Sequence, residues 1–216
     1  MVEKFHHELE ELKENIVSMG NLAKEMLIKS VIALKNQDNE IADWVLSKKG
    51  EIAKMDEEIE EKALRLIALY QPMAKDMRTI AVCLKIITYL TRIGRYGKDI
   101  ANVAKELSSE PHIKKLVSIP YMADIVCKMI DDALYAFKTE DLTPLQDFSE
   151  RDDTIDALRY SIFRECLTYM MEDQKYITRC AHYMMIARYL ERCADHACKI
   201  AEKIYYMVNG VRIEIK

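Results

Sequence analysis

Apolar residues recur at helical spacing along almost the entire chain, and this pattern limits the fold more than any other feature. The periodicity stops where turn-forming residues gather, as at Gln71-Pro72 and Thr143-Pro144, and each proline suits the first turn of a following helix. Glycine and proline are scarce, with 5 and 4 residues in 216, so we predict an all-α protein. The expected helices span residues 3–36, 38–70, 72–108, 120–139, 144–173 and 174–208.

The chain contains an internal repeat, because residues 75–104 align with residues 175–204 at a constant offset. The match includes the tetrapeptides YLTR and YLER, which begin at Tyr89 and Tyr189, and an Ile-Ala pair at the same distance beyond each. Two tandem three-helix bundles are the simplest architecture that explains it. We assign residues 1–110 to the first bundle, 111–119 to a linker, 120–208 to the second bundle and 209–216 to a C-terminal tail.

The charge and the apolar runs argue against two classes of function. The net charge is -4, and no cluster of lysine and arginine marks a nucleic-acid surface. The N-terminal residues lack the apolar core of a signal peptide, and the most apolar run, residues 80–90, is interrupted by Lys85. We therefore expect a cytoplasmic protein with no membrane span. Its six cysteines form no CxxC pair, so reduced thiols are expected.

Two carboxylates, Glu191 and Asp195, lie one turn apart in the last expected helix, where like charges repel. A helical wheel places them at the edge of the apolar stripe and turns Arg192 and His196 further outward. The preceding helix offers a second acidic pair, Asp152 and Asp156, and carboxylate oxygens are the usual ligands of hard cations. Two explanations stay open: a metal centre, or local pairing of Glu191 with Arg188 and of Asp195 with Arg192 or Lys199.

Other chemistries find no support in the sequence. The HExxH motif and the glycine-rich phosphate loop are both missing, and no nucleophile is paired with a base. We therefore predict a protein that is not an enzyme. Gly94 and Gly97, inside an expected helix, are better explained by close helix packing than by ligand binding.

The block ARYLERCADHACKIAE, from Ala187 to Glu202, resembles the LERIGDHAxNIA signature of the PhoU family of phosphate-transport regulators. The block that begins YQPMAKDMRTIA at Tyr70 is similar to the corresponding block in the first half of that family. The resemblance implies a cytosolic protein that binds a multinuclear metal centre at E(D)xxxD motifs. It also implies coupling of a phosphate-specific ABC transporter to phosphate signalling.

Residue by residue, the second half keeps the family motif as Glu191 and Asp195, whereas the first half carries Thr91 and Arg95. This exchange argues against a metal site of the family type in the first bundle. Asp99 is expected to pair with Arg95 one turn away. The further candidates for metal or structural polar roles are Asp56, Glu60, Asp99 and His196. The positions that match other family motifs are Asp76, Arg78, Arg92 and Arg192.

The resulting hypothesis is a homodimeric PhoU-like regulator whose metal is held by Glu191, Asp195, Asp152 and Asp156. The metal would be iron, zinc or another divalent cluster, and the partners would be the transporter ATPase, a phosphate-sensing kinase, or both. Two alternatives remain: a metal-free helical adaptor with the same partners, and a carboxylate-metal helical enzyme.

Overall fold

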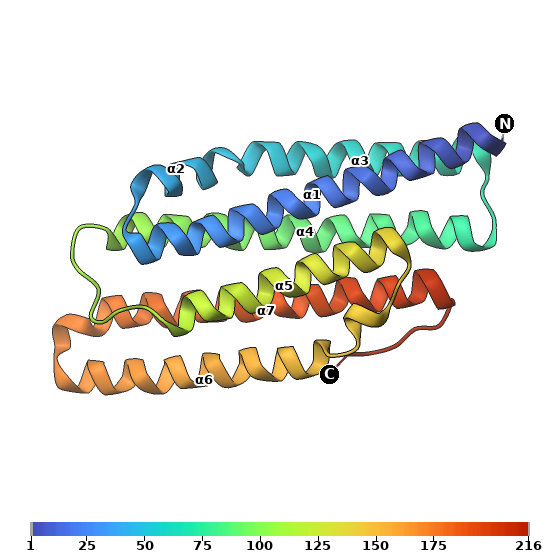
Figure 1. Ribbon diagram of the computed structural model, residues 1–216. Coiled ribbons are helices and arrows are strands. Elements are labelled where there is room, and N and C mark those ends of the chain that lie inside the picture. The colour runs from blue at the N-terminus through green and yellow to red at the C-terminus, as the bar shows by residue number, and fades with distance from the viewer. Residues whose placement is uncertain (1, 216) are drawn as a thin grey trace.

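The computed structural model describes residues 2–215 as two helical units joined side by side (Figure 1). The first unit contains α1 (Val2–Asn36), α2 (Asn39–Ser47), α3 (Lys49–Tyr70) and α4 (Ala74–Leu107). The second contains α5 (Ser118–Thr139), the 3-10 turn η1 (Thr143–Leu145), α6 (Phe148–Glu172), the 3-10 turn η2 (Gln174–Tyr176) and α7 (Ile177–Asn209). No strand occurs within residues 2–215, and the all-α prediction is confirmed.

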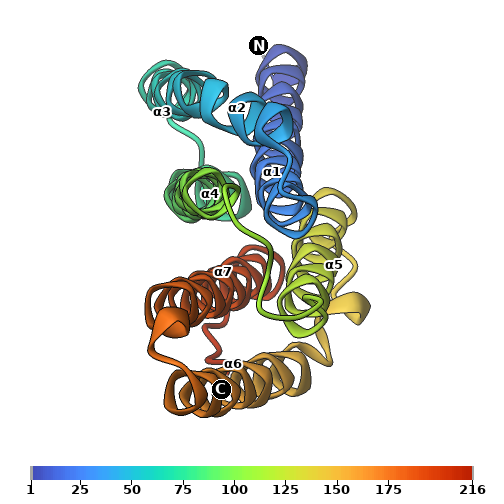
Figure 2. The same cartoon turned by 90° about the vertical axis from the view of Figure 1, so that its left-hand side faces the viewer.

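The two units meet through α4 and α7, with α1 and α5 in contact beside them, as the end-on view shows (Figure 2). Within the first unit α4 packs on α1 and α3, and within the second α7 packs on α5 and α6. Buried apolar side chains from both units form one continuous core. No helix of the described residues is long and apolar enough to cross a lipid bilayer.

Recognisable caps mark the first or last turn of several helices. Asp38 accepts hydrogen bonds from the backbone amides of Glu40 (2.9 Å) and Ile41 (3.0 Å) and so caps α2. Gln71 and Glu140 adopt left-handed backbone conformations after α3 and α5. Gly210 does the same after α7, at φ 72°.

Three expected helix boundaries are wrong. The helix predicted over residues 38–70 is divided at Lys48, whose amide bonds to the Val45 carbonyl in a tight turn. Pro72 and Pro144 lie outside the α-helices, because α4 begins at Ala74 after an extended residue and Pro144 lies in η1. Both prolines therefore lie in the connections between α-helices and not in the first turn of an α-helix.

Gly97 allows the closest helix approach in the first unit. A Cβ atom built on Gly97 would lie 2.9 Å from the backbone carbonyl carbon of Met26, so any side chain would force α1 and α4 apart. The packing explanation of Gly97 is therefore confirmed.

The contact between the units reproduces the sequence repeat. Helices α4 and α7 run in opposite directions (Figure 1), and Tyr89 packs on His196 while Tyr96 packs on Tyr189, with ring centroids 5.7 and 5.4 Å apart. The two contacts exchange equivalent residues, as around a twofold axis. Tyr96 and His196, themselves equivalent, stack at 6.0 Å near that axis.

The linker and the tail are held by polar contacts. His112 of the linker lies 2.7 Å from the Tyr183 hydroxyl and 2.8 Å from the Leu34 carbonyl, and so joins the two units. In the tail, the Ile215 amide donates to the buried Glu202 carboxylate at 3.1 Å. The six cysteines are free thiols, as predicted, and five of them are buried.

Candidate functional site

The structure brings together the four carboxylates that the sequence analysis paired: Asp152 and Asp156 on α6, and Glu191 and Asp195 on α7. Burial raises the pKa of Asp152 to about 6, and repulsion from Asp195, Asp156 and Glu191 adds to the effect. Burial and Asp195 likewise raise the pKa of Glu191. The cluster therefore holds more negative charge than its surroundings readily solvate.

Neighbouring arginines offset part of this charge. Arg188 bonds to Glu191 at 2.5 Å, and Arg192 bonds to Asp195 at 2.8 Å. Lys199 bonds instead to Glu202 at 2.8 Å, so the alternative pairing of Asp195 with Lys199 is wrong. The local ion pairs that the sequence left open are therefore present. They involve Glu191 and Asp195 on α7 but not Asp152, whose pKa is raised.

The residue types of the cluster are those that bind a hard cation, but their side chains are not arranged around a common point. One carboxylate oxygen of Glu191, Oε2, is buried without a hydrogen-bond partner, and the nearest cationic nitrogen, Nε of Arg192, lies 3.7 Å away. However, no three histidine, cysteine, aspartate or glutamate side chains within residues 2–215 are arranged to hold a metal ion. Carboxylate side chains that repel one another take positions that a bound cation would change.

The first bundle has a different arrangement at the same register. The hydroxyl of Thr91 donates to Asp56 at 2.9 Å, which confirms that α3 and α4 face each other as α6 and α7 do. Glu60 is exposed, and Asp99 pairs with Lys98 at 2.8 Å, so the expected pairing of Asp99 with Arg95 is wrong. The three acidic candidates of this half do not form a cluster like that of the second bundle.

His196 does not point outward as the helical wheel indicated. Its side chain is buried between Tyr89 and Tyr96, and its Nε2 has no hydrogen-bond partner. Burial, with a smaller contribution from Arg92, lowers the pKa of His196 to about 4, so the imidazole is neutral at pH 7. The wheel was misleading because α7 is covered by α4 as well as by α5 and α6.

Asp76 and Arg78 lie near helix ends and are not part of the acidic cluster. Asp76 lies 3.8 Å from His6 of α1. The guanidinium of Arg78 lies 3.6 Å from the position that a Cβ atom on Gly210 would occupy, at the end of α7. These contacts agree with the interpretation of the block around Asp76 as one that holds the turn.

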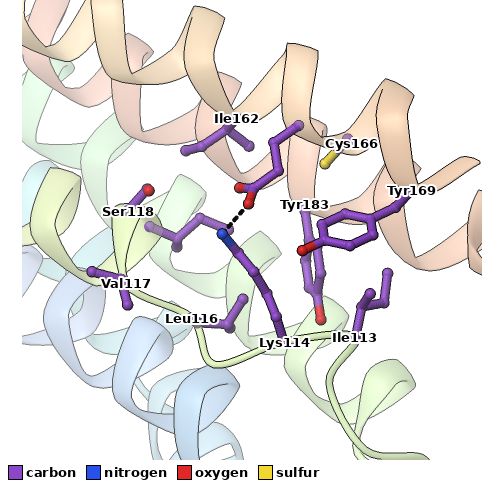
Figure 3. Close-up of a pocket in the computed structure, with 11 residues that line it drawn as sticks. Ile113, Lys114, Leu116, Val117, Ser118, Ile162, Cys166, Tyr169 and Tyr183 are labelled. Atoms are coloured by element: carbon purple, nitrogen blue, oxygen red, sulfur yellow. Dashed lines mark hydrogen bonds and ion pairs between the residues drawn. The ribbon is translucent and has the colours of Figure 1, made fainter.

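Sequence reasoning missed a pocket under the linker (Figure 3). Ile113, Leu116 and Val117 cover Cys166 and Tyr169 of α6, while Lys114 reaches across to pair with Glu165. The cavity holds about 20 Å³, enough for roughly one water at ~10–15 Å³ each, so it is a packing site and not a ligand site. The linker and the contacted part of α6 are about 50 residues apart in the sequence, so helical periodicity could not predict this contact.

Comparison with known proteins agrees with these features. A model of the PhoU domain matches the chain twice, over residues 16–104 and 119–204. The chain belongs to the PhoU family. A PhoU homolog of Clostridium acetobutylicum is 34% identical over 98% of this chain and 97% of its own. Another, from Aquifex aeolicus, is 38% identical over 96% of this chain and 94% of its own. Both relatives are named phosphate-specific transport system accessory proteins.

Solved PhoU structures share the complete fold. The crystal structure of PhoU from Pseudomonas aeruginosa superposes with a TM-score of 0.91 at 33% identity, and covers 96% of this chain and 100% of that one. The phosphate transport regulatory protein PhoU from Streptococcus pneumoniae gives a TM-score of 0.88 at 27% identity, over 97% and 99% of the two chains. The tandem-repeat fold is therefore confirmed. PhoU proteins are named as accessory or regulatory proteins, which agrees with the prediction that this chain is not an enzyme.

Proposed function

We propose that this PhoU protein regulates phosphate uptake and phosphate-response signalling by modulating a phosphate-specific ABC transporter. In this proposal it acts in the cytoplasm as a homodimer, through the transporter ATPase, a phosphate-sensing kinase, or both. The names of its relatives as phosphate-specific transport accessory proteins support the assignment.

We further propose that Asp152, Asp156, Glu191 and Asp195 hold a divalent metal such as iron or zinc. The observation that carries this step is the meeting of these carboxylates from α6 and α7, where burial, followed by repulsion from the other three, raises the pKa of Asp152 to about 6. The buried free oxygen of Glu191 provides an unused ligand atom. A bound cation supplies positive charge at this surface, where it can attract phosphate or an acidic partner segment.

Metal analysis of protein prepared without chelator tests the centre. Asp152→Asn and Asp195→Asn remove one charge each from opposite helices and are expected to lower bound metal at least several-fold. Asp56→Asn is the matched control, because it removes a carboxylate at the corresponding place in the first bundle. Metal content that stays the same in both second-bundle variants would rule the centre out.

One observation favours the second candidate, a metal-free adaptor of the same partners. Arg188 and Arg192 already pair with Glu191 and Asp195, which reduces the need for a cation. Co-purification with the transporter ATPase, with and without chelator, separates the two functions. Binding that survives chelator and the Asp152→Asn substitution identifies the adaptor, whereas binding lost in both identifies the metal-dependent regulator.

A further inference from the structure

A second cavity, of about 110 Å³, opens between α3 and α4 in the first bundle. Its inner wall is apolar and is formed by Met26, Ile52 and Gly94. Three cationic side chains also line it: Lys49 from the start of α3, and Arg95 and Lys98 from α4. At ~10–15 Å³ per water, the space accepts several waters or one small oxyanion.

The cations around this cavity are only partly neutralised. Lys98 pairs with Asp99 at 2.8 Å, and the nearby carboxylate of Asp56 accepts from Thr91, another lining residue. Among the residues that the structure describes, the side chains of Lys49 and Arg95 form no ion pair or hydrogen bond, and both are exposed. The two cations without a partner lie on opposite helices, Lys49 on α3 and Arg95 on α4.

The position of the cavity matters because of the repeat. Arg95 occupies the register of Asp195, and Thr91 that of Glu191, so the first bundle replaces two acidic groups with a guanidinium and a hydroxyl whose proton is donated to Asp56. A guanidinium presents N–H donors in a fork that matches two oxygens of a tetrahedral oxyanion.

We propose that the cavity lined by Thr91, Arg95, Lys98 and Lys49 binds a small oxyanion of the phosphate class. Arg95 and Lys49 supply the uncompensated charge from opposite sides. The choice of inorganic phosphate as the first ligand rests on the proposed function, whereas the cationic cavity does not. The protein would then carry a cation site in one bundle and an anion site in the other.

Isothermal titration with inorganic phosphate, at low ionic strength, tests the proposal. The wild-type protein is expected to give saturable binding. Arg95→Gln should weaken it about ten- to a hundredfold, the range for loss of a hydrogen bond to a charged group. Ala53→Leu fills the cavity from its lining without changing any charge, and should weaken binding as well. Thermal unfolding of each variant verifies that it is folded.

Arg65→Gln is the matched control. It removes the same charge from an exposed position on α3, about three turns beyond Ala53 and outside the cavity lining. Unchanged binding in this variant supports the site. Lack of saturable binding by the wild type, or an equal loss in Arg65→Gln and Arg95→Gln, would overturn it.

The same titration separates this site from the metal centre. Asp195→Asn is expected to lower metal content and to leave phosphate binding intact, whereas Arg95→Gln should do the reverse. Failure of the metal centre therefore leaves the phosphate result unaffected, and the two proposals are tested independently.

Discussion

In the second bundle, Asp152 of α6 interacts with Glu191 and Asp195 of α7, and their mutual repulsion raises its pKa to about 6. In the first bundle, Asp56 of α3 accepts from Thr91 of α4, and Arg95 lines a cavity one turn further on. One helix arrangement thus carries opposite charges at matching positions. The fold thus determines which helix positions bring charged side chains close together, and the residue types at those positions determine the sign of the charge.

The largest expected effect concerns packing rather than charge. Gly97→Leu should lower the free energy of unfolding by about 3 kcal/mol, because the backbone of Met26 leaves no space for a side chain. The matching residue of the second bundle is Ala197, where a Cβ atom is already accommodated, and Ala197→Gly should cost only about 1 kcal/mol. Urea denaturation measures both. Equal losses of unfolding free energy in the two variants would mean that the helices are equally close at Gly97 and at Ala197.

The second prediction transfers the acidic motif to the first bundle. Thr91→Glu combined with Arg95→Asp should create a carboxylate cluster with Asp56 and raise metal affinity about tenfold or more, equivalent to about 1.4 kcal/mol. Metal content per chain measures the gain, and Asp152→Asn in the same protein distinguishes the new site from the old one. If the double variant binds no additional metal, the four side chains alone do not explain the second-bundle centre.

The third prediction concerns His196 at the contact between the units. Its folded pKa of about 4 is below the usual 6.5, so the unfolded chain takes up a proton first as the pH falls. The contribution of His196 to stability is therefore present above pH 6.5 and is lost as the pH falls towards 4. His196→Phe keeps a ring against Tyr89 and Tyr96 and should remove about 1–2 kcal/mol of this acid sensitivity. Denaturation of chelator-treated protein across this range measures it, and an unchanged pH slope would contradict the prediction.

The smallest effect has the opposite sign and comes from Asp152. Its folded pKa of about 6 is above the usual 3.8, so the folded chain keeps its proton longer as the pH rises. Stability is favoured below pH 3.8 and falls as the pH rises through 6. In chelator-treated protein, Asp152→Asn should gain about 1 kcal/mol over the wild type at pH 7, after allowance for solvent screening. Asp56→Asn, whose carboxylate already accepts a hydrogen bond, should show no such gain.

Much of this architecture is readable from spacing. The helices and the approach of α6 to α7 follow from apolar and acidic periodicity within each helix, and the repeat follows from comparing the two halves of the chain. The burial of His196 does not, because a wheel assigns one buried face to a helix while α7 is covered by three others. The cavity beside Arg95 was missed for a similar reason. Lys49 and Lys98 are far apart in the sequence, and only the packing of α3 on α4 brings them together.

The sequence by itself determined the all-α repeat, the free thiols and the loss of the acidic motif from the first bundle. These properties depend on residue identity and on spacing along the chain. Only the tertiary structure decided how deeply the four carboxylates are buried, which arginines offset them and where a cationic cavity lies. Charge interactions between helices depend on distance and burial, and both quantities arise only when the helices pack.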